Sequence, residues 1–125
     1  MPDLLANGAA WLAEKLLAHA AQDVLYVRGS EAIPLRATVG RREVLVETSV
    51  GMAERHEQWE FVLRPKDLVF GGVMVEPRRG DRIKHVRGGV THVYEVMPLV
   101  GEDVFRPSDP FGELLRVHAK FVGTE

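Results

Sequence analysis

The sequence predicts a mainly β protein, a small antiparallel β-barrel or sandwich preceded by an N-terminal α-helix. Apolar residues recur every three or four positions only over residues 3–22, which is the period of a helix. From residue 24 the period changes to two, and short β-rich segments follow one another at near-regular spacing. Pro, Gly and Asp separate these segments, as in small barrels. We therefore expect a single domain over residues 1–125, with a helix at 3–22 and an antiparallel β-domain at 24–122.

The expected helix has one apolar face. Residues spaced by three or four positions stack on this face, namely Leu5, Ala9, Leu12, Leu16 and Ala20. Gly8 weakens the helix, because a glycine costs about 1 kcal/mol in a helix interior relative to alanine. The helix therefore begins at Asp3 or, alternatively, at Asn7 as its N-cap, with residues 1–6 as a separate arm.

The first strands of the β-domain are expected at residues 24–28, 33–39 and 43–47. Gly29-Ser30 ends the first of them and Gly40 ends the second. Pro34 places the second strand at an edge or at a strand start, because proline cannot donate a ladder hydrogen bond. Residues 48–54 contain Gly51 and are expected to form a loop.

The next strand, at residues 58–63, alternates well. Trp59, Phe61 and Leu63 share one face, and Glu60 lies on the other. A turn or a single helical turn at 64–68 follows.

Four segments complete the β-domain. A short strand is expected at 73–76, a turn at 77–81 and a hairpin of 82–86 with 90–97 around Gly88-Gly89. The last strand, at 113–122, carries Leu115, Val117, Ala119 and Phe121 on one face. His118 alternates with two of these residues, so we expect its side chain to face water.

Composition limits the classes of protein. The chain has no cysteine, which excludes a disulfide framework, a thiolate metal site and a cysteine nucleophile, and fits a reducing compartment. Its formal net charge is −2, so the chain as a whole is not a polycation built to hold nucleic acid. No apolar run approaches the roughly 20 residues of a membrane span, so we expect no membrane partner. Asp3 stands where a signal peptide would carry basic residues, so we expect no signal peptide.

His85 and His92 are the best candidates for metal ligands. If Gly88-Gly89 forms a two-residue turn, the two histidines oppose each other, with Cβ atoms about 5 Å apart. A zinc site needs further ligands, and the sequence supplies no third one nearby. The alternative is a pair of exposed strand histidines beside a hairpin tip, and we expect no metal.

The sequence shows no catalytic set. It has no nucleophile elbow, P-loop or dinucleotide fingerprint. Glu54, Glu57 and Glu60 form an acidic strip, but strand alternation puts Glu57 on the opposite face from the other two. A general acid–base pair must converge in a pocket. We therefore expect no enzyme, no catalytic or cofactor-binding residue and no cofactor.

Two segments are candidates for an interface with other molecules. One is the basic hairpin, whose cations fall within ten residues: Arg78, Arg79, Arg82, Lys84 and Arg87. These cations suit a phosphate backbone or an acidic neighbour, and the alternative is a solvated turn. The other is the loop at residues 105–111, whose candidate contact residues are Phe105, Arg106, Asp109 and Phe111. Its aromatic residues suit a neighbouring subunit, and the alternative is a loop pinned to its own core.

The order of these segments resembles the small head-to-tail joining proteins of tailed bacteriophages. Those proteins carry a Pro-x-x-Gly-Asp-x-Ile turn, which this chain matches at Pro77, Gly80, Asp81 and Ile83. Further matches are Arg28-Gly29, Ala37-Thr38-Val39-Gly40, Tyr94-Glu95-Val96, Ser108-Asp109-Pro110, Arg116, His118 and Lys120. The chain departs from the pattern where Phe105-Arg106-Pro107 replaces an aromatic pair and where Ala119 replaces a threonine.

The resemblance implies a structural virion protein of the phage neck. Copies of the chain would form a ring that joins the portal or an adaptor to the tail, and that ring could help to retain the packaged DNA that passes through it. Assembly would take place in the cytoplasm of the host bacterium. The alternative function is a free-standing small β-barrel that binds nucleic acid or a protein partner in the cytoplasm.

Overall fold

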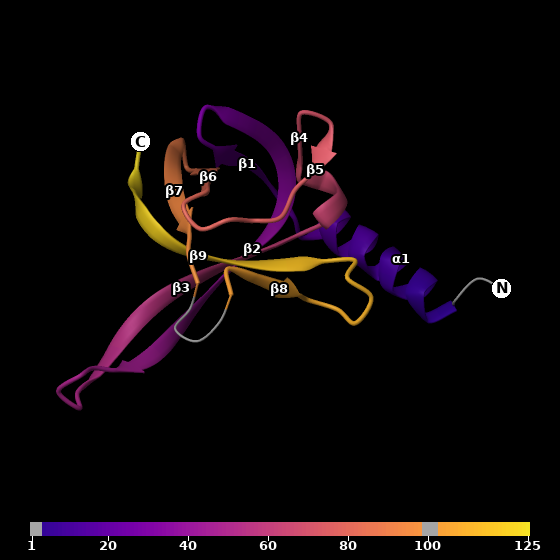
Figure 1. The fold of residues 1–125 in the computed structure, drawn as a ribbon. Helices are drawn as coiled ribbons and strands as arrows, with labels where there is room; N and C mark the ends of the chain where they lie inside the picture. The colour runs from indigo at the N-terminus through magenta and orange to yellow at the C-terminus, as the bar shows by residue number, and fades with distance from the viewer. Residues whose placement is uncertain (1–3, 99–102) are drawn as a thin grey trace.

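The alternation of apolar and polar residues lets the β-domain close on itself. The computed structural model describes residues 4–98 and 103–125, and over these residues six strands form a closed antiparallel barrel (Figure 1). Around the barrel the order is β1 (Gln22–Arg28), β2 (Glu31–Glu47), β3 (Ala53–Leu63), β9 (Leu115–Thr124), β7 (Val90–Val96) and β6 (Arg82–Arg87). The pairing of β6 with β1 closes the ring of strands. The barrel and the preceding helix confirm the expected fold class.

The core fills the barrel with large side chains from every strand. Phe61 and Leu63 of β3 are fully buried, which confirms the face predicted for that strand. The other fully buried members of the core are Tyr26, Ala37, Leu68, Ile83, Tyr94, Val96 and Val117. Burying a side chain of this size stabilises the fold by about 1.5–3 kcal/mol.

Three short elements lie outside the barrel wall. The 3-10 turn η1 (Pro65–Asp67) confirms the single helical turn expected there, and it leads into the small hairpin of β4 (Val69–Phe70) and β5 (Val73–Met74). The strand β8 (Phe105–Pro107) pairs with residues 115–117 of β9, where only a loop was expected. Arg106 precedes Pro107, and a residue before proline favours extended backbone, so this segment is suited to extend the sheet.

Strand β2 is longer than the sequence predicted. The expected strands 33–39 and 43–47 are one 17-residue strand, and Gly40 continues it by pairing with Glu60. The expectation of a break was wrong because a glycine weakens a strand without ending it. Pro34 lies in the part of β2 that pairs with β1 but not yet with β3, whose pairing begins at Thr38, so this part of β2 has one unpaired edge, as expected for a strand that contains a proline.

The hairpin of β2 and β3 projects beyond the barrel. Only residues 59–63 of β3 pair with β9, while β2 and β3 pair with each other down to Glu47 and Ala53. The outer part of this hairpin therefore forms a two-stranded arm that points away from the barrel (Figure 1).

The helix α1 (Leu4–His19) projects on the side of the barrel away from the arm (Figure 1). It begins before Asn7, so the alternative of an N-cap at Asn7 is wrong. Where its side chains are described, the predicted apolar face is largely open: Leu5 is 75% exposed and Leu12 is 62% exposed. The reason is tertiary, since α1 contacts the barrel mainly through β2 and does not lie across the core. Over the described residues, no helix has the length and apolar character needed to cross a membrane.

His118 is buried, and the expectation that it faces water was wrong. Its side chain is on the outer face of the barrel, where it is paired in register with Glu60 of β3. Beside it, Glu60 Oε1 lies 3.7 Å from His118 Nδ1, and the backbone N–H of His118 donates to the Val104 carbonyl at 2.8 Å where β8 extends the sheet along β9. His118 is therefore only 1% exposed.

Candidate docking surfaces

The turn at residues 77–81 is fixed by one buried carboxylate. Asp81 accepts hydrogen bonds from the Tyr26 hydroxyl, from Arg28 Nε at 3.1 Å and Nη2 at 2.7 Å, and from the backbone N–H of Arg78 at 2.9 Å. Arg28 also donates to the Glu76 carbonyl at 2.6 Å. Arg28 thereby joins β1 to both ends of the turn, through Asp81 and through the Glu76 carbonyl. Its bidentate contact with Asp81 is the strong geometry for an arginine–carboxylate pair.

The electrostatics of the turn favour an ionised Asp81. Burial alone would raise the pKa of Asp81, whose side chain is 6% exposed, but hydrogen bonds from Arg28 and Tyr26 outweigh burial and lower it. Burial, together with the hydrogen bond to Asp81, raises the pKa of Tyr26 far above its ordinary value. The pair therefore stays as a carboxylate and a neutral phenol at neutral pH.

The hydrogen bonds of Asp81 hold the turn that contains Pro77 and Gly80, and exposed arginines lie around this turn. Gly80 adopts a φ of 93°, a left-handed conformation that favours glycine, and its N–H donates to the Val96 carbonyl at 2.9 Å. Arg78, Arg79 and Arg82 are all exposed around this turn. We call these three residues the arginine turn.

The other two cations of the basic hairpin are engaged elsewhere. Lys84 forms an ion pair with Glu125 at 3.0 Å. Arg87 lies on the same side of β6 as Ile83 and His85, because side chains alternate along a strand. The five basic residues predicted as one surface are therefore divided: Lys84 and Arg87 are engaged with other side chains, whereas the three residues of the arginine turn are exposed side by side.

Arg87 belongs to an aromatic cluster at one end of the barrel. Its guanidinium lies 5.4 Å from the centre of the Trp59 ring and donates to the Tyr94 hydroxyl at 3.2 Å. Tyr94 lies 5.0 Å from Trp59 and 5.6 Å from Phe121, measured between ring centres. The sequence analysis missed this cluster, because its members come from four different strands and no local spacing joins them.

His85 and His92 are directly opposed, as the two-residue turn predicts. His85 is 3% exposed, and burial, followed by the charges of Arg87 and His92, lowers its pKa. The nitrogen Nδ1 of His92 lies 3.4 Å from Arg87 Nη2, so a cation already occupies its vicinity. Among residues 4–98 and 103–125, no three His, Cys, Asp or Glu side chains group as metal ligands would.

The loop at residues 105–111 is pinned by its own acidic residue. Asp109 accepts backbone hydrogen bonds from Phe111 at 3.0 Å and from Leu114 at 2.8 Å, and these bonds lower its pKa although burial opposes them. Phe105 packs against the barrel core. Asp109 and Phe105 therefore hold the loop in place, whereas Arg106 and Phe111 remain exposed to a partner.

A groove of about 470 Å³ connects the two predicted segments. One wall is Met74, Val75 and Glu76, which lead directly into the arginine turn. The rest of the lining is Phe105 of the predicted loop segment, Gly112 just after that segment, Leu115 of β9 and Pro65 of η1. We call this space the β5–β8 groove. Of the predicted interface residues, Phe105 lines this apolar depression, and sequence spacing alone could not show the depression.

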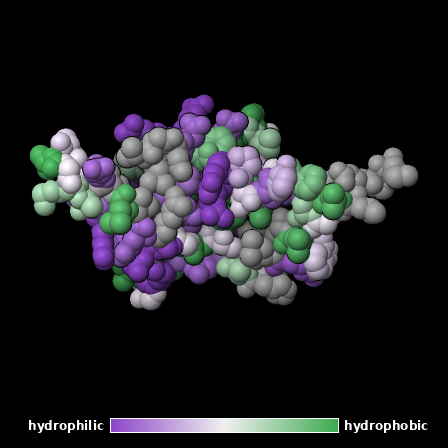
Figure 2. All heavy atoms as spheres, turned by 90° about the horizontal axis from the view of Figure 1, so that it is seen from below, coloured by the Kyte–Doolittle hydropathy of each residue, from purple (hydrophilic) through white to green (hydrophobic). Residues whose placement is uncertain are grey.

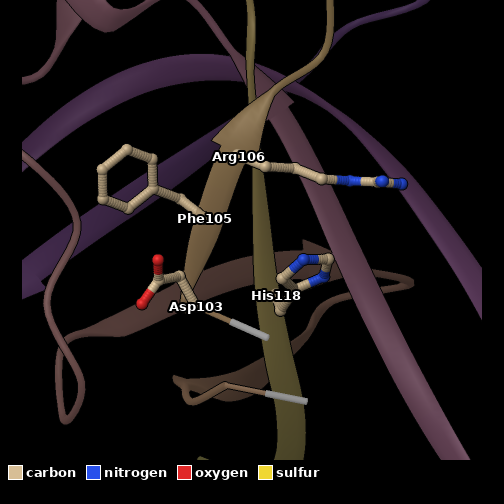
Figure 3. Close-up of a pocket in the computed structure, with 4 residues that line it drawn as sticks. All are labelled: Asp103, Phe105, Arg106 and His118. Atoms are coloured by element: carbon tan, nitrogen blue, oxygen red, sulfur yellow. The ribbon is translucent and has the colours of Figure 1, made fainter. Parts of the chain in front are cut away.

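A second, smaller cavity of about 300 Å³ is lined by Asp103, Phe105, Arg106 and His118. In Figure 3, Asp103 and Phe105 point to one side of the β8–β9 pair and Arg106 and His118 to the other. Behind it, Glu60 lies 3.0 Å from Arg116 and 3.7 Å from His118. The four side chains that line the cavity, Asp103, Phe105, Arg106 and His118, do not converge on one point, so the cavity lacks the geometry of an acid–base site.

Several exposed apolar residues lie at the two ends of the molecule, Leu5, Trp11 and Leu12 on α1 and Leu45, Val50 and Met52 on the arm. Figure 2 shows hydrophobic residues at the end that carries α1 and at the opposite end, where the arm lies, with hydrophilic residues between them. Exposed apolar ends, an apolar groove and a rigid arginine turn are typical of proteins that work by docking onto other proteins. These surfaces favour a protein that docks onto other proteins.

The comparison with known families agrees with this class. A family model described as "Phage head-tail joining protein" matches residues 2–125, and the chain belongs to this family. It is a structural protein of the phage neck and a virion component that contacts portal and tail proteins. No curated protein matches the chain in sequence.

Proposed function

We propose that copies of this chain form a ring between the portal, or an adaptor on it, and the tail, and that this ring helps to retain packaged DNA. The observation that carries the proposal is that one chain presents different exposed surfaces: the arginine turn with the adjoining β5–β8 groove, and the exposed apolar residues of α1. A ring needs such heterologous contacts, in which one surface of a copy meets a different surface of the next.

The charges suit a conduit for DNA. The net charge is −2, and several of the cations are paired, as Lys84 is with Glu125 and Arg116 is with Glu60. A chain whose net charge is negative repels phosphate groups as a whole, so DNA can pass without sticking. Assembly would take place in the cytoplasm of the host bacterium, and we propose no catalytic activity.

The alternative, a free-standing barrel that binds nucleic acid, would depend on the basic hairpin. The arginine turn is the part of it that stays exposed. An affinity for DNA that falls steeply with salt would favour this alternative, because neutralising phosphates releases counterions.

The experiment that tests the joining function reverses the charge of the arginine turn. Particles carrying Arg79→Glu with Arg82→Glu should contain separate heads and tails, because like charges at a contact repel. Both side chains are exposed, so the variant protein should fold and keep its denaturant midpoint. Electron microscopy counts the joined particles.

The matched control is Arg55→Glu with Lys120→Glu, which makes the same change of charge at exposed positions outside the turn. The control should join heads to tails at the wild-type yield. Normal joining by the Arg79 and Arg82 variant would remove the arginine turn from the interface. Loss of joining by both variants would show that net charge, not this turn, is responsible.

A further inference from the structure

The helix α1 carries an apolar face that its own barrel does not cover. Leu5 is 75% exposed, Trp11 is 57% exposed and Leu12 is 62% exposed. With 3.6 residues per turn these side chains lie on one side of the helix, and the exposed Gly8 lies among them. A glycine at the centre of such a face lets another surface approach the helix backbone closely. An open apolar face of this kind on a helix marks a contact site.

The β5–β8 groove has the matching chemistry. Its walls are mainly apolar, and the side chains beside it are open to solvent: Val73 and Met74 are each 63% exposed and Phe111 is 42% exposed. Among the described residues, the lining of this groove comes from η1, residues 74–76 and the segment 105–115, and none of it comes from α1. The groove and the helix face are therefore two separate open surfaces on one chain.

The charges beside these surfaces are complementary. The Lys15 ammonium lies 5.8 Å from the centre of the Trp11 ring, so a positive charge accompanies the helix face. Glu76 is the charged residue in the lining of the groove. Opposite charges at matching positions orient an encounter and fix its register.

We propose that α1 of one copy docks into the β5–β8 groove of the next copy, with Trp11 seated in the groove and Lys15 near Glu76. This inference rests on the proposed ring and names the contact that would build it. The helix and the groove are different surfaces, so the contact is heterologous and propagates from copy to copy until the ring closes. An amphipathic helix in an apolar groove is a common mode of recognition, and tryptophan is enriched among the residues that dominate such interfaces.

A photo-crosslinking residue in place of Trp11 identifies what covers the helix. Particles are grown with a mixture of ¹⁵N-labelled and unlabelled variant chains, irradiated and digested, and the crosslinked peptides are identified by mass spectrometry. We expect crosslinks to residues 65–76 or 105–115, with about half of them joining a labelled chain to an unlabelled one when the two are mixed equally. The same crosslinker in place of Val50, which is 77% exposed on the arm, is the matched control and should not reach the groove.

The outcomes separate this inference from the proposed ring. Crosslinks from position 11 to a portal or tail protein would overturn the docking of α1 while leaving the joining function intact. Crosslinks confined to one isotopic form would show that α1 folds back on its own chain, and would overturn it as well. Absence of the chain from joined particles would overturn the proposed function itself.

A charge exchange tests the pairing of Lys15 with Glu76 independently. Lys15→Glu alone and Glu76→Lys alone should each lower the yield of joined particles at least several-fold, because each places like charges together. The double variant should restore most of the yield. Equal loss in the double variant and in the single variants would contradict the pairing.

Discussion

At the scale of single residues, the turn at residues 77–81 is held by Asp81, which accepts hydrogen bonds from Arg28, from Tyr26 and from the backbone of Arg78. The sequence analysis placed Asp81 in a turn but gave it no partner. Its partners Tyr26 and Arg28 lie 55 and 53 positions earlier in the chain, and only the pairing of β1 with β6 brings them close. Asp109, in contrast, could be predicted as a turn residue, because its carboxylate oxygens accept hydrogen bonds from backbone N–H groups within five positions, those of Phe111 and Leu114.

Asp81→Asn should lower the free energy of unfolding by about 2–4 kcal/mol. Removing one partner of a buried ion pair costs about 3–5 kcal/mol, and the 20% exposure of Arg28 reduces this cost. Denaturant unfolding measures the change. Asp67→Asn is the control, since its ion pair with Arg64 is more exposed and should contribute about 0–1 kcal/mol. Equal effects of the two substitutions would contradict the role given to Asp81.

His85 should make the barrel sensitive to mild acid. Its pKa in the folded protein lies below its ordinary value of 6.5, so the unfolded chain binds the proton more tightly. The contribution of neutral His85 to the free energy of unfolding is therefore fully present above about pH 6.5, and it is lost as the pH falls from there through the pKa of His85 in the folded protein. Unfolding free energies measured from pH 7.5 to 5 should fall less in His85→Gln than in the wild type. An identical pH dependence in both proteins would show that His85 is not responsible.

At the scale of elements, strands bounded by strong turns were predictable and strands bounded by tertiary contacts were not. Gly88-Gly89 fixed the register of β6 and β7, including the opposed His85 and His92. Gly40 predicted a break that β2 does not make, because pairing with β3 carries the strand through it. The apolar period of α1 predicted a helix correctly but not its exposure, since periodicity shows which face is apolar and not what covers it.

The division of β2 and β3 into barrel and arm predicts unequal costs of truncation. Phe61→Ala should destabilise the protein by about 3–5 kcal/mol, because Phe61 is fully buried and its ring lies 5.1 Å from that of Tyr94. Leu45→Ala on the arm should change stability by no more than about 0.5 kcal/mol, because Leu45 is 70% exposed. Although Glu60 lies on the outer face of β3, Glu60→Ala would be a poor control, since this side chain is only 12% exposed and is paired with Arg116. A comparable loss of stability in both variants would mean that the arm packs as the barrel does.

At the scale of the whole molecule, the barrel holds separate docking surfaces at fixed positions. The arginine turn is tied to β1 and β7, the β5–β8 groove is built on β9 and η1, and α1 extends from the barrel (Figure 1). The family and the mainly β fold could be predicted from the sequence, because the turn motifs are local and ordered. The groove could not, because it is formed by segments that lie about 30–50 positions apart and meet only when the barrel closes.

The measurement that tests the central claim most directly is cryo-electron microscopy of the neck in joined particles. We expect a closed ring of these barrels between the portal and the tail, with the arginine turn and the groove at contacts between proteins. The same particles made without the chain should show heads without tails. Joined particles that lack the ring, or that form at the wild-type yield without the chain, would contradict the account.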